Sequence, residues 1–210
     1  MQEIAIERKQ DEAYDNMLRI IRDDSLMALE YLEKNKEKFS SLKRLEIKDN
    51  IMKELDSNGK EFLARQSLKG TYAIYEEPSV ENGFTLLNID KVESVISYYA
   101  NRISSLCKVR LMKLLWYADS LAYKQYGRSI TGLVYKHNKM GALPIGHNQL
   151  LTLEKVNVME EVEVLDKVIL KFKNYNTQEI VDYMHEEKAY KDTKPGDVIS
   201  FTLAKEIRAF

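Results

Sequence analysis

Hydrophobic side chains recur every three or four positions along residues 108–126, which predicts an α-helix of about five turns. Gly127 follows the last periodic residue, at the place where a left-handed helix cap favours glycine. We expect this helix to organise the remainder of the chain. Its apolar stripe consists of Leu111, Leu114, Leu115, Ala118, Leu121 and Ala122.

The same periodicity predicts further helices. Residues 3–55 show narrow apolar stripes among dense charges, which indicates two or three helices, and Ser57, Asn58 and Gly59 indicate a break after them. Additional helices are expected at residues 91–105, 147–153, 176–190 and 202–210. Short strands are expected at residues 71–75 and 84–87, and a bend or hairpin at 129–135. Residues 154–170 mix strand and helix signals, and both interpretations stay open.

These elements predict a predominantly α-helical α+β protein, with a helical core and a small antiparallel sheet. A change in composition before residue 80 divides the chain into a helical extension, residues 1–80, and a domain, residues 81–210. The narrow stripes of the extension fit either a hairpin packed on a neighbour or a coiled-coil contact between two copies.

Composition supports a folded chain. Of 210 residues, 44% are hydrophobic and 31% charged, which argues against global disorder. The formal net charge of −1 gives no general argument for binding nucleic acid, although residues 101–140 contain eight basic residues against one acid. The single cysteine excludes an internal disulfide, and we see neither a signal peptide nor a transmembrane segment. These features predict a cytoplasmic protein without membrane contact.

The residues that usually mark an enzyme are missing from the sequence. It contains no glycine-rich phosphate loop, zinc-binding helix or nucleophile elbow, so we expect no enzymatic activity, cofactor or metal. The histidines, His137, His147 and His185, are too far apart in sequence to share one helix face. Cys107 and His185 could nominally form a catalytic pair, but a structural role for His185, through a hydrogen bond to a backbone carbonyl or to Asp119, is favoured.

Aromatic residues gather in and around the organising helix. Two interpretations stay open, core filling and a protein interface, because tyrosine and tryptophan serve both purposes well. The basic residues nearby fit a phosphate contact or an ordinary solvated face. The aromatic residues are Trp116, Tyr117, Tyr123, Tyr126, Tyr135 and Tyr190, and the basic ones are Arg110, Lys113, Arg128 and Lys136.

At these residues the chain resembles the Panacea domain, or SocA-like antitoxin domain, of bacteria and their phages. The resemblance rests on residues 111–126, 129–132 and 185–204, and it extends over roughly residues 85–210. The family's aromatic-Gly-Pro-Val-Pro turn is kept in outline only, as Met140, Gly141, Ala142, Leu143 and Pro144.

The resemblance implies a protein that binds and neutralises a cognate toxin by direct contact, without chemistry of its own. Residues 1–80 would then supply partner choice or a homo-oligomer contact. The alternatives are a DNA-binding repressor of its own operon, disfavoured because residues 1–80 are acidic and lack a helix-turn-helix pattern, and a phage-encoded inhibitor or protease adaptor. The expected partner-binding residues are Trp116, Tyr117, Asp119, Tyr123, Tyr126, Arg128, Tyr135, Met140, Pro144, His185 and Tyr190.

Overall fold

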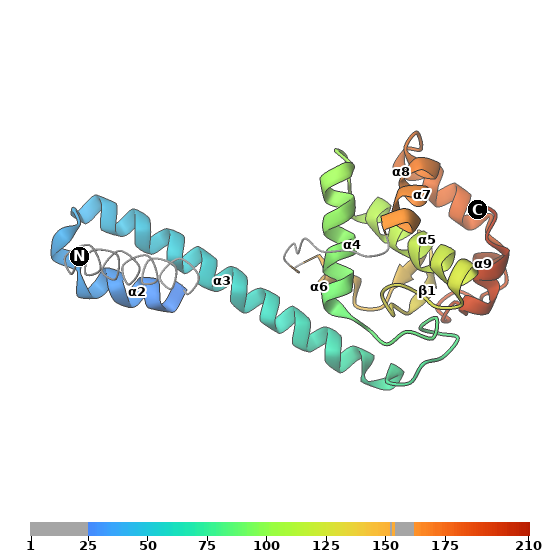
Figure 1. The fold of residues 1–210 in the computed structure, drawn as a ribbon, viewed down its shortest axis with the longest axis horizontal. Helices are drawn as coiled ribbons and strands as arrows, with labels where there is room; N and C mark the ends of the chain where they lie inside the picture. The colour runs from blue at the N-terminus through green and yellow to red at the C-terminus, as the bar shows by residue number, and fades with distance from the viewer. Residues whose placement is uncertain (1–24, 152, 154–161) are drawn as a thin grey trace, which may run out of the picture. The chain divides into compact units, whose positions relative to one another are not determined.

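Helix α5, Lys108–Tyr126, is the central element of the larger part of the chain in the computed structural model, which describes residues 25–151, 153 and 162–210 (Figure 1). It contacts α4 (Ile89–Arg102), α7 (Val162–Phe172), α8 (Thr177–His185), the strand β2 (Gly141–Pro144) and the 3₁₀ segment η3 (Phe201–Glu206). Gly127 has φ 73°, and its N–H donates to the Tyr123 carbonyl at 2.9 Å. The predicted helix and its glycine cap are therefore confirmed.

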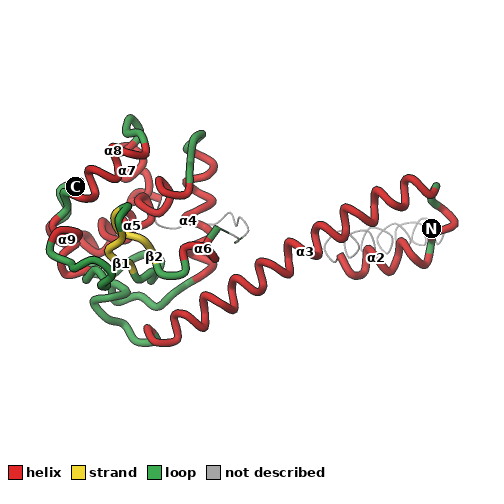
Figure 2. Tube along the Cα trace, turned by 180° about the vertical axis from the view of Figure 1, so that it is seen from behind, coloured by secondary structure: helices red, strands yellow, loops and turns green. Residues whose placement is uncertain are grey.

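The sheet is small and antiparallel. Strand β1 (Tyr135–Asn138) pairs with β2, with Tyr135 opposite Pro144 (Figure 2). On the other edge of β1, Lys136 forms an antiparallel bridge with Val198, which brings the C-terminal segment alongside the sheet. These strands among helices confirm the predicted α+β class with helix predominant.

Several helices begin at the capping residues from which the sequence predicted a helix start. The Asn88 side chain accepts a hydrogen bond from the Lys91 N–H at 2.9 Å at the start of α4. Asn176 and Glu179 form a reciprocal capping box at the start of α8. The helix predicted for residues 176–190 is interrupted after α8 and continues as α9 (Lys188–Lys191). A short α6 (His147–Leu150) follows the sheet, and the predicted terminal helix is the 3₁₀ segment η3.

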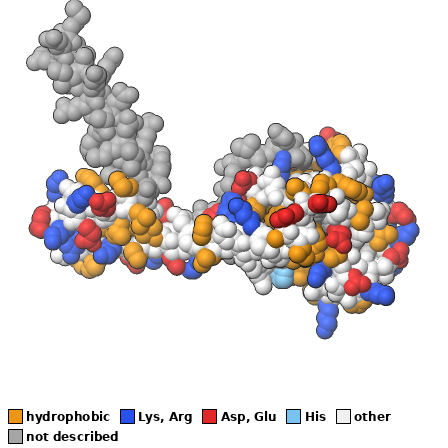
Figure 3. All heavy atoms as spheres, turned by 90° about the horizontal axis from the view of Figure 1, so that it is seen from below, with side chains coloured by type: hydrophobic (Ala, Val, Ile, Leu, Met, Phe, Trp, Pro, Cys, Tyr) orange, Lys and Arg blue, Asp and Glu red, His pale blue; other side chains and the backbone are white. Residues whose placement is uncertain are grey.

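Contacts divide the chain into two units, Met1–Phe62 and Leu63–Phe210. In the first unit, α2 (Ser25–Lys34) and the short 3₁₀ segment η1 (Lys36–Lys38) precede α3 (Ser41–Tyr72), and Lys48 forms an ion pair with Glu33 at 2.9 Å. Hydrophobic, acidic and basic side chains are interspersed on the face of the described part of this unit that Figure 3 shows. The helix pattern expected before residue 25 lies outside the described residues.

Three local predictions were wrong. Helix α3 continues through residues 57–59, because a glycine inside a helix costs only about 1 kcal/mol relative to alanine. An exposed ion pair between Lys60 and Asp56 at 2.5 Å spans the expected break and adds a small stabilisation. Residues 71–75 form the end of α3 and the 3₁₀ segment η2 (Ala73–Tyr75) instead of a strand. The phenol of Tyr72, which is buried, donates to the Ile145 carbonyl at 3.1 Å, and this tertiary contact outweighs strand propensity.

Residues 84–87 also form no strand. They lie in a turn and an extended segment that leads into α4. Of the ambiguous region, residues 154–161 lie outside the described residues. The remainder belongs to the helix Val162–Phe172, since Val164, Leu165 and Val168 turn inward at helical spacing. No described helix has both the length and the apolar character needed to cross a membrane.

Candidate functional site

Most of the residues expected to contact a partner are part of the core. The exposed fraction of their side chains is at most 4%, so the expectation that these residues present their rings to another macromolecule is corrected. The physical reason is the position of α5, which is surrounded by α4, α7, α8, β2 and η3. The residues concerned are Trp116, Tyr117, Asp119, Tyr123 and Tyr135, and Pro144 is buried with them.

A smaller group stays on the surface. Tyr126, at the end of α5, is 59% exposed, and Arg128 beside it is also exposed. Met140, at the turn between β1 and β2, is 44% exposed, while His185 and Tyr190 are half-buried. The predicted contact set is therefore reduced to two surface regions, one at the end of α5 and one near the β-turn.

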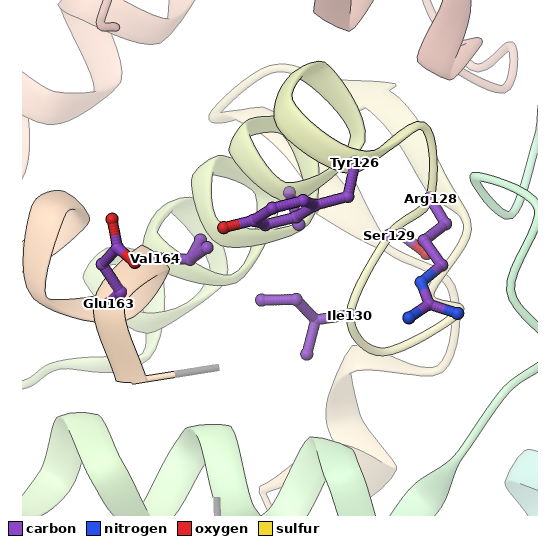
Figure 4. A pocket seen from close by; sticks show the side chains of 7 residues that line it. Tyr126, Arg128, Ser129, Ile130, Glu163 and Val164 are labelled. Carbon is purple, nitrogen blue, oxygen red and sulfur yellow. The ribbon is translucent and has the colours of Figure 1, made fainter. Parts of the chain in front are cut away.

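A pocket of about 260 Å³ lies beside the end of α5, and we call it the Tyr126 pocket. The ring of Tyr126 extends from α5 toward the first turn of α7, and Arg128 and Ile130 approach from the loop that follows α5 (Figure 4). The pocket thus combines an aromatic ring, a guanidinium and aliphatic groups. Its walls are formed by Ala122, Tyr126, Arg128, Ser129, Ile130, Glu163 and Val164.

The loop that forms one wall of the pocket is fixed by Asp119. The Asp119 carboxylate accepts hydrogen bonds from the Ile130 N–H at 2.9 Å, from the Thr131 N–H and hydroxyl at 2.9 and 2.5 Å, and from the Tyr135 phenol at 2.7 Å. Burial raises the pKa of this carboxyl group, and the four hydrogen bonds oppose that rise. Asp119 therefore shapes the pocket from beneath without reaching its surface.

On the opposite wall, Glu163 belongs to the first turn of α7. It accepts a hydrogen bond from Lys167 at 2.7 Å. This hydrogen bond, together with the positive charge of the lysine, lowers the pKa of the Glu163 carboxyl group. The Tyr126 pocket consequently has a cation on the loop side and an acid on the helix side. A bound protein could meet both charges while its apolar side chains pack on Tyr126 and Ile130.

The second surface region is an aromatic stack. The Tyr190 ring lies between two imidazoles, 3.8 Å from His137 and 4.7 Å from His185, measured between ring centroids. The Tyr190 phenol donates to the Asn138 carbonyl at 2.8 Å, which ties α9 to the β-turn that carries Met140. His185 therefore has a packing role.

The sequence favoured a hydrogen bond from His185 to a backbone carbonyl or to Asp119, and the bond to Asp119 does not form. Among the described residues, His185 Nε2 is buried without a hydrogen-bond partner, and the Asp119 oxygens are taken by the loop and Tyr135. A Cys107 and His185 pair is also contradicted. Cys107 Sγ contacts the Thr177 hydroxyl at 3.3 Å at the start of α8, whereas His185 ends that helix about 12 Å away.

Two basic residues of α5, Arg110 and Lys113, are buried and do not belong to a solvated face. Lys113 is 1% exposed, and its ammonium group donates to the Ala142 carbonyl at 2.6 Å. Burial lowers its pKa from 10.5 to about 7. Arg110 is 8% exposed. Sequence reasoning missed both burials, although the position of Lys113 between Met112 and Leu114 inside an apolar run was an available signal.

No three histidine, cysteine, aspartate or glutamate side chains in the described part of the chain come together in a way that could hold a metal ion. The Tyr126 pocket is suited to recognising a protein surface through an exposed aromatic ring and a guanidinium group at a concave site.

Comparison with known protein families gives one match. Residues 111–191 match the family described as antitoxin SocA-like, Panacea domain. The matched segment begins within α5 and ends with α9, so it contains both surface regions described above. The predicted resemblance is confirmed over this segment. No curated protein and no solved structure matches the chain.

Proposed function

Because residues 111–191 carry a SocA-like Panacea domain and are therefore antitoxin-like, we infer that this chain binds a toxin protein and neutralises it by direct contact. The observation that carries the proposal is the Tyr126 pocket within the matched segment, where Tyr126 and Arg128 are exposed next to each other. Tyrosine and arginine are the residue types that most often carry binding energy at protein contacts.

The proposed mode of action is occlusion of the toxin, without catalysis by this chain. Tyr126 would bury its ring against an apolar group of the toxin, and Arg128 would bind a carboxylate or carbonyl. Asp119 holds the loop in place beforehand, so little conformational freedom is lost on binding. The β-turn with Met140 and the stacked Tyr190 are proposed as a second, smaller contact.

A growth assay tests the proposal. The product of the gene beside this one is expressed alone and together with this chain, and growth is expected to stop in the first case and to recover in the second. The double variant Tyr126→Ala with Arg128→Ala should fail to restore growth. The matched control, Ile74→Ala with Lys194→Ala, removes an exposed apolar group and an exposed cation elsewhere and should restore it. Equal rescue by both variants would place the contact outside the pocket.

Residues 1–80 are proposed to supply partner choice or contact between two copies. Exposed apolar side chains on the described part of the first unit, among them Leu42, Leu45 and Phe62, support this assignment. Sedimentation equilibrium of the full chain would show a dimer if the copies contact each other, and a monomer would leave partner choice as the role.

The rival functions predict other results in simple assays. A repressor would shift its upstream DNA in a gel, with binding that weakens steeply as salt rises. A protease adaptor would accelerate degradation of its client, whereas an occluding antitoxin would protect the toxin. The burial of Lys113 removes one cation from the surface that a nucleic acid could reach, so it supports the protein partner.

A further inference from the structure

A second pocket lies at the opposite end of α5 from the Tyr126 pocket. Its volume is about 160 Å³, and three segments meet there: the end of α4, the loop that leads into α5, and the end of α7. Its polar lining consists of three cations and two hydroxyl groups, with no acidic residue among them. We call it the Arg110 pocket. Its polar lining residues are Arg102, Ser104, Ser105, Arg110 and Lys173.

Arg110 is an unusual residue to find buried. The side chain is 8% exposed, and its guanidinium donates one hydrogen bond, from Nη2 to the Phe172 carbonyl at 3.1 Å. Its Nε is buried without a hydrogen-bond partner, and Arg110 forms no ion pair with any residue that the structure describes. Buried charges in proteins are normally paired, because removing an ion from water costs several kcal/mol.

A purely structural role accounts for only part of this arrangement. Phe172 is the last residue of α7, so Arg110 binds the negative end of a helix dipole, which carries roughly half an elementary charge. A guanidinium is always charged and has five N–H donors, of which this contact uses one. The helix end therefore compensates only part of the guanidinium charge, and the Nε donor stays buried without a partner among the described residues.

Two further cations converge on the same pocket. Arg102 ends α4, and Lys173 directly follows α7, so chain segments far apart in sequence bring both residues to the lining of this pocket. Arg102 lies over the Tyr98 ring, with its Cζ 3.6 Å from the centroid, which orients it without neutralising it. The acid beside that ring, Asp166, accepts a hydrogen bond from the Tyr98 phenol at 2.7 Å and does not line the pocket.

We propose that the Arg110 pocket binds a phosphate monoester group carried by a small molecule. Three positive charges suit a group that carries close to two negative charges at neutral pH better than they suit a single carboxylate. The guanidinium N–H groups and the serine hydroxyls match the several acceptor oxygens of such a group. This site is separate from toxin binding, because Arg110 and Tyr126 are sixteen residues apart on α5, which is about 24 Å.

Titration of the full chain tests the proposal. Inorganic phosphate, glycerol phosphate and acetate are added at constant ionic strength while amide chemical shifts are followed by NMR. Both phosphates should bind with shifts centred on residues 102–110 and 172–173, and acetate should bind at least tenfold more weakly. Inorganic phosphate binding without glycerol phosphate binding would overturn the assignment to a monoester.

Three variants distinguish the pocket from general attraction to positive charge. Arg110→Gln should weaken phosphate binding about tenfold or more, since a hydrogen bond to a charged group is lost. Because that residue is buried, Arg102→Gln with Lys173→Gln provides a second test on exposed residues, and a similar loss is expected. Lys194→Gln removes one exposed charge elsewhere and should leave binding unchanged.

The proposal is overturned if phosphate and acetate give equal affinities, if the shifts fall elsewhere, or if the double variant binds as tightly as the original chain. None of these results would bear on the growth assay, which depends on Tyr126 and Arg128. The two proposals can therefore fail independently.

Discussion

Lys113 provides the sharpest prediction about stability. Its amine is enclosed by the core, and the structure gives it a single hydrogen bond, to the Ala142 carbonyl. Burial disfavours the charged form, so its pKa falls from 10.5 in the unfolded chain to about 7 in the folded protein. Between these pH values the unfolded chain binds the proton and the folded chain does not. The free energy of unfolding must therefore rise with pH across this interval.

The magnitude follows from the two pKa values. The complete difference corresponds to at most about 5 kcal/mol, and the part gained between pH 7 and pH 9 is about 2 kcal/mol. Lys113→Met keeps a similar volume and removes the titrating group. It also leaves the Ala142 carbonyl without its donor, at a cost of about 1 to 3 kcal/mol that does not depend on pH. The expected signature is therefore the loss of the pH-dependent gain.

Urea denaturation at pH 7, 8 and 9 measures this gain. Trp116 is the single tryptophan and is buried on the same helix, so its fluorescence reports unfolding of the unit that contains Lys113. The original chain should gain about 2 kcal/mol more than Lys113→Met between pH 7 and pH 9. Exposed Lys194→Met serves as the control and should follow the original chain. Parallel curves for the original chain and Lys113→Met would refute the reasoning.

Three further substitutions follow from the site. Asp119→Asn should lower the free energy of unfolding by about 3 to 5 kcal/mol, because four donors converge on that carboxylate; a loss below 1 kcal/mol in thermal denaturation would contradict this. Gly132→Ala should cost at least about 2 kcal/mol in urea denaturation, since φ is 73° and a Cβ would meet the Leu86 carbonyl; near-native stability would show that the loop can shift. Tyr126→Ala should change the free energy of unfolding by less than about 0.5 kcal/mol in urea denaturation, and a larger loss would mean that this exposed ring supports the fold.

Sequence reasoning succeeded where local signals and tertiary structure agree. The periodic stripe of α5, the glycine that ends it and the capping box of α8 are encoded within a few neighbouring residues. It failed at residues 71–75, where β propensity lost to the contact between Tyr72 and Ile145, residues 73 positions apart. Contacts at such sequence separation cannot be read from a local pattern.

The candidate site was predicted only in part, for a related reason. The sequence indicates that α5 is amphipathic and aromatic, but it does not reveal that five elements cover the helix on nearly every side. Trp116 and Tyr117 were therefore expected at a surface that the structure gives to Tyr126 and Arg128 instead. For the same reason the sequence did not indicate that Arg110 and Lys113, interpreted as a phosphate contact or a solvated face, are buried.

Direct binding is the most decisive test of the antitoxin proposal. The purified chain and the product of the neighbouring gene are combined in a calorimeter, and the account predicts a complex with a dissociation constant that increases by about thirtyfold or more for Tyr126→Ala with Arg128→Ala. A chain that shows no binding heat with that product, or a double variant that binds as tightly as the original, would contradict the account.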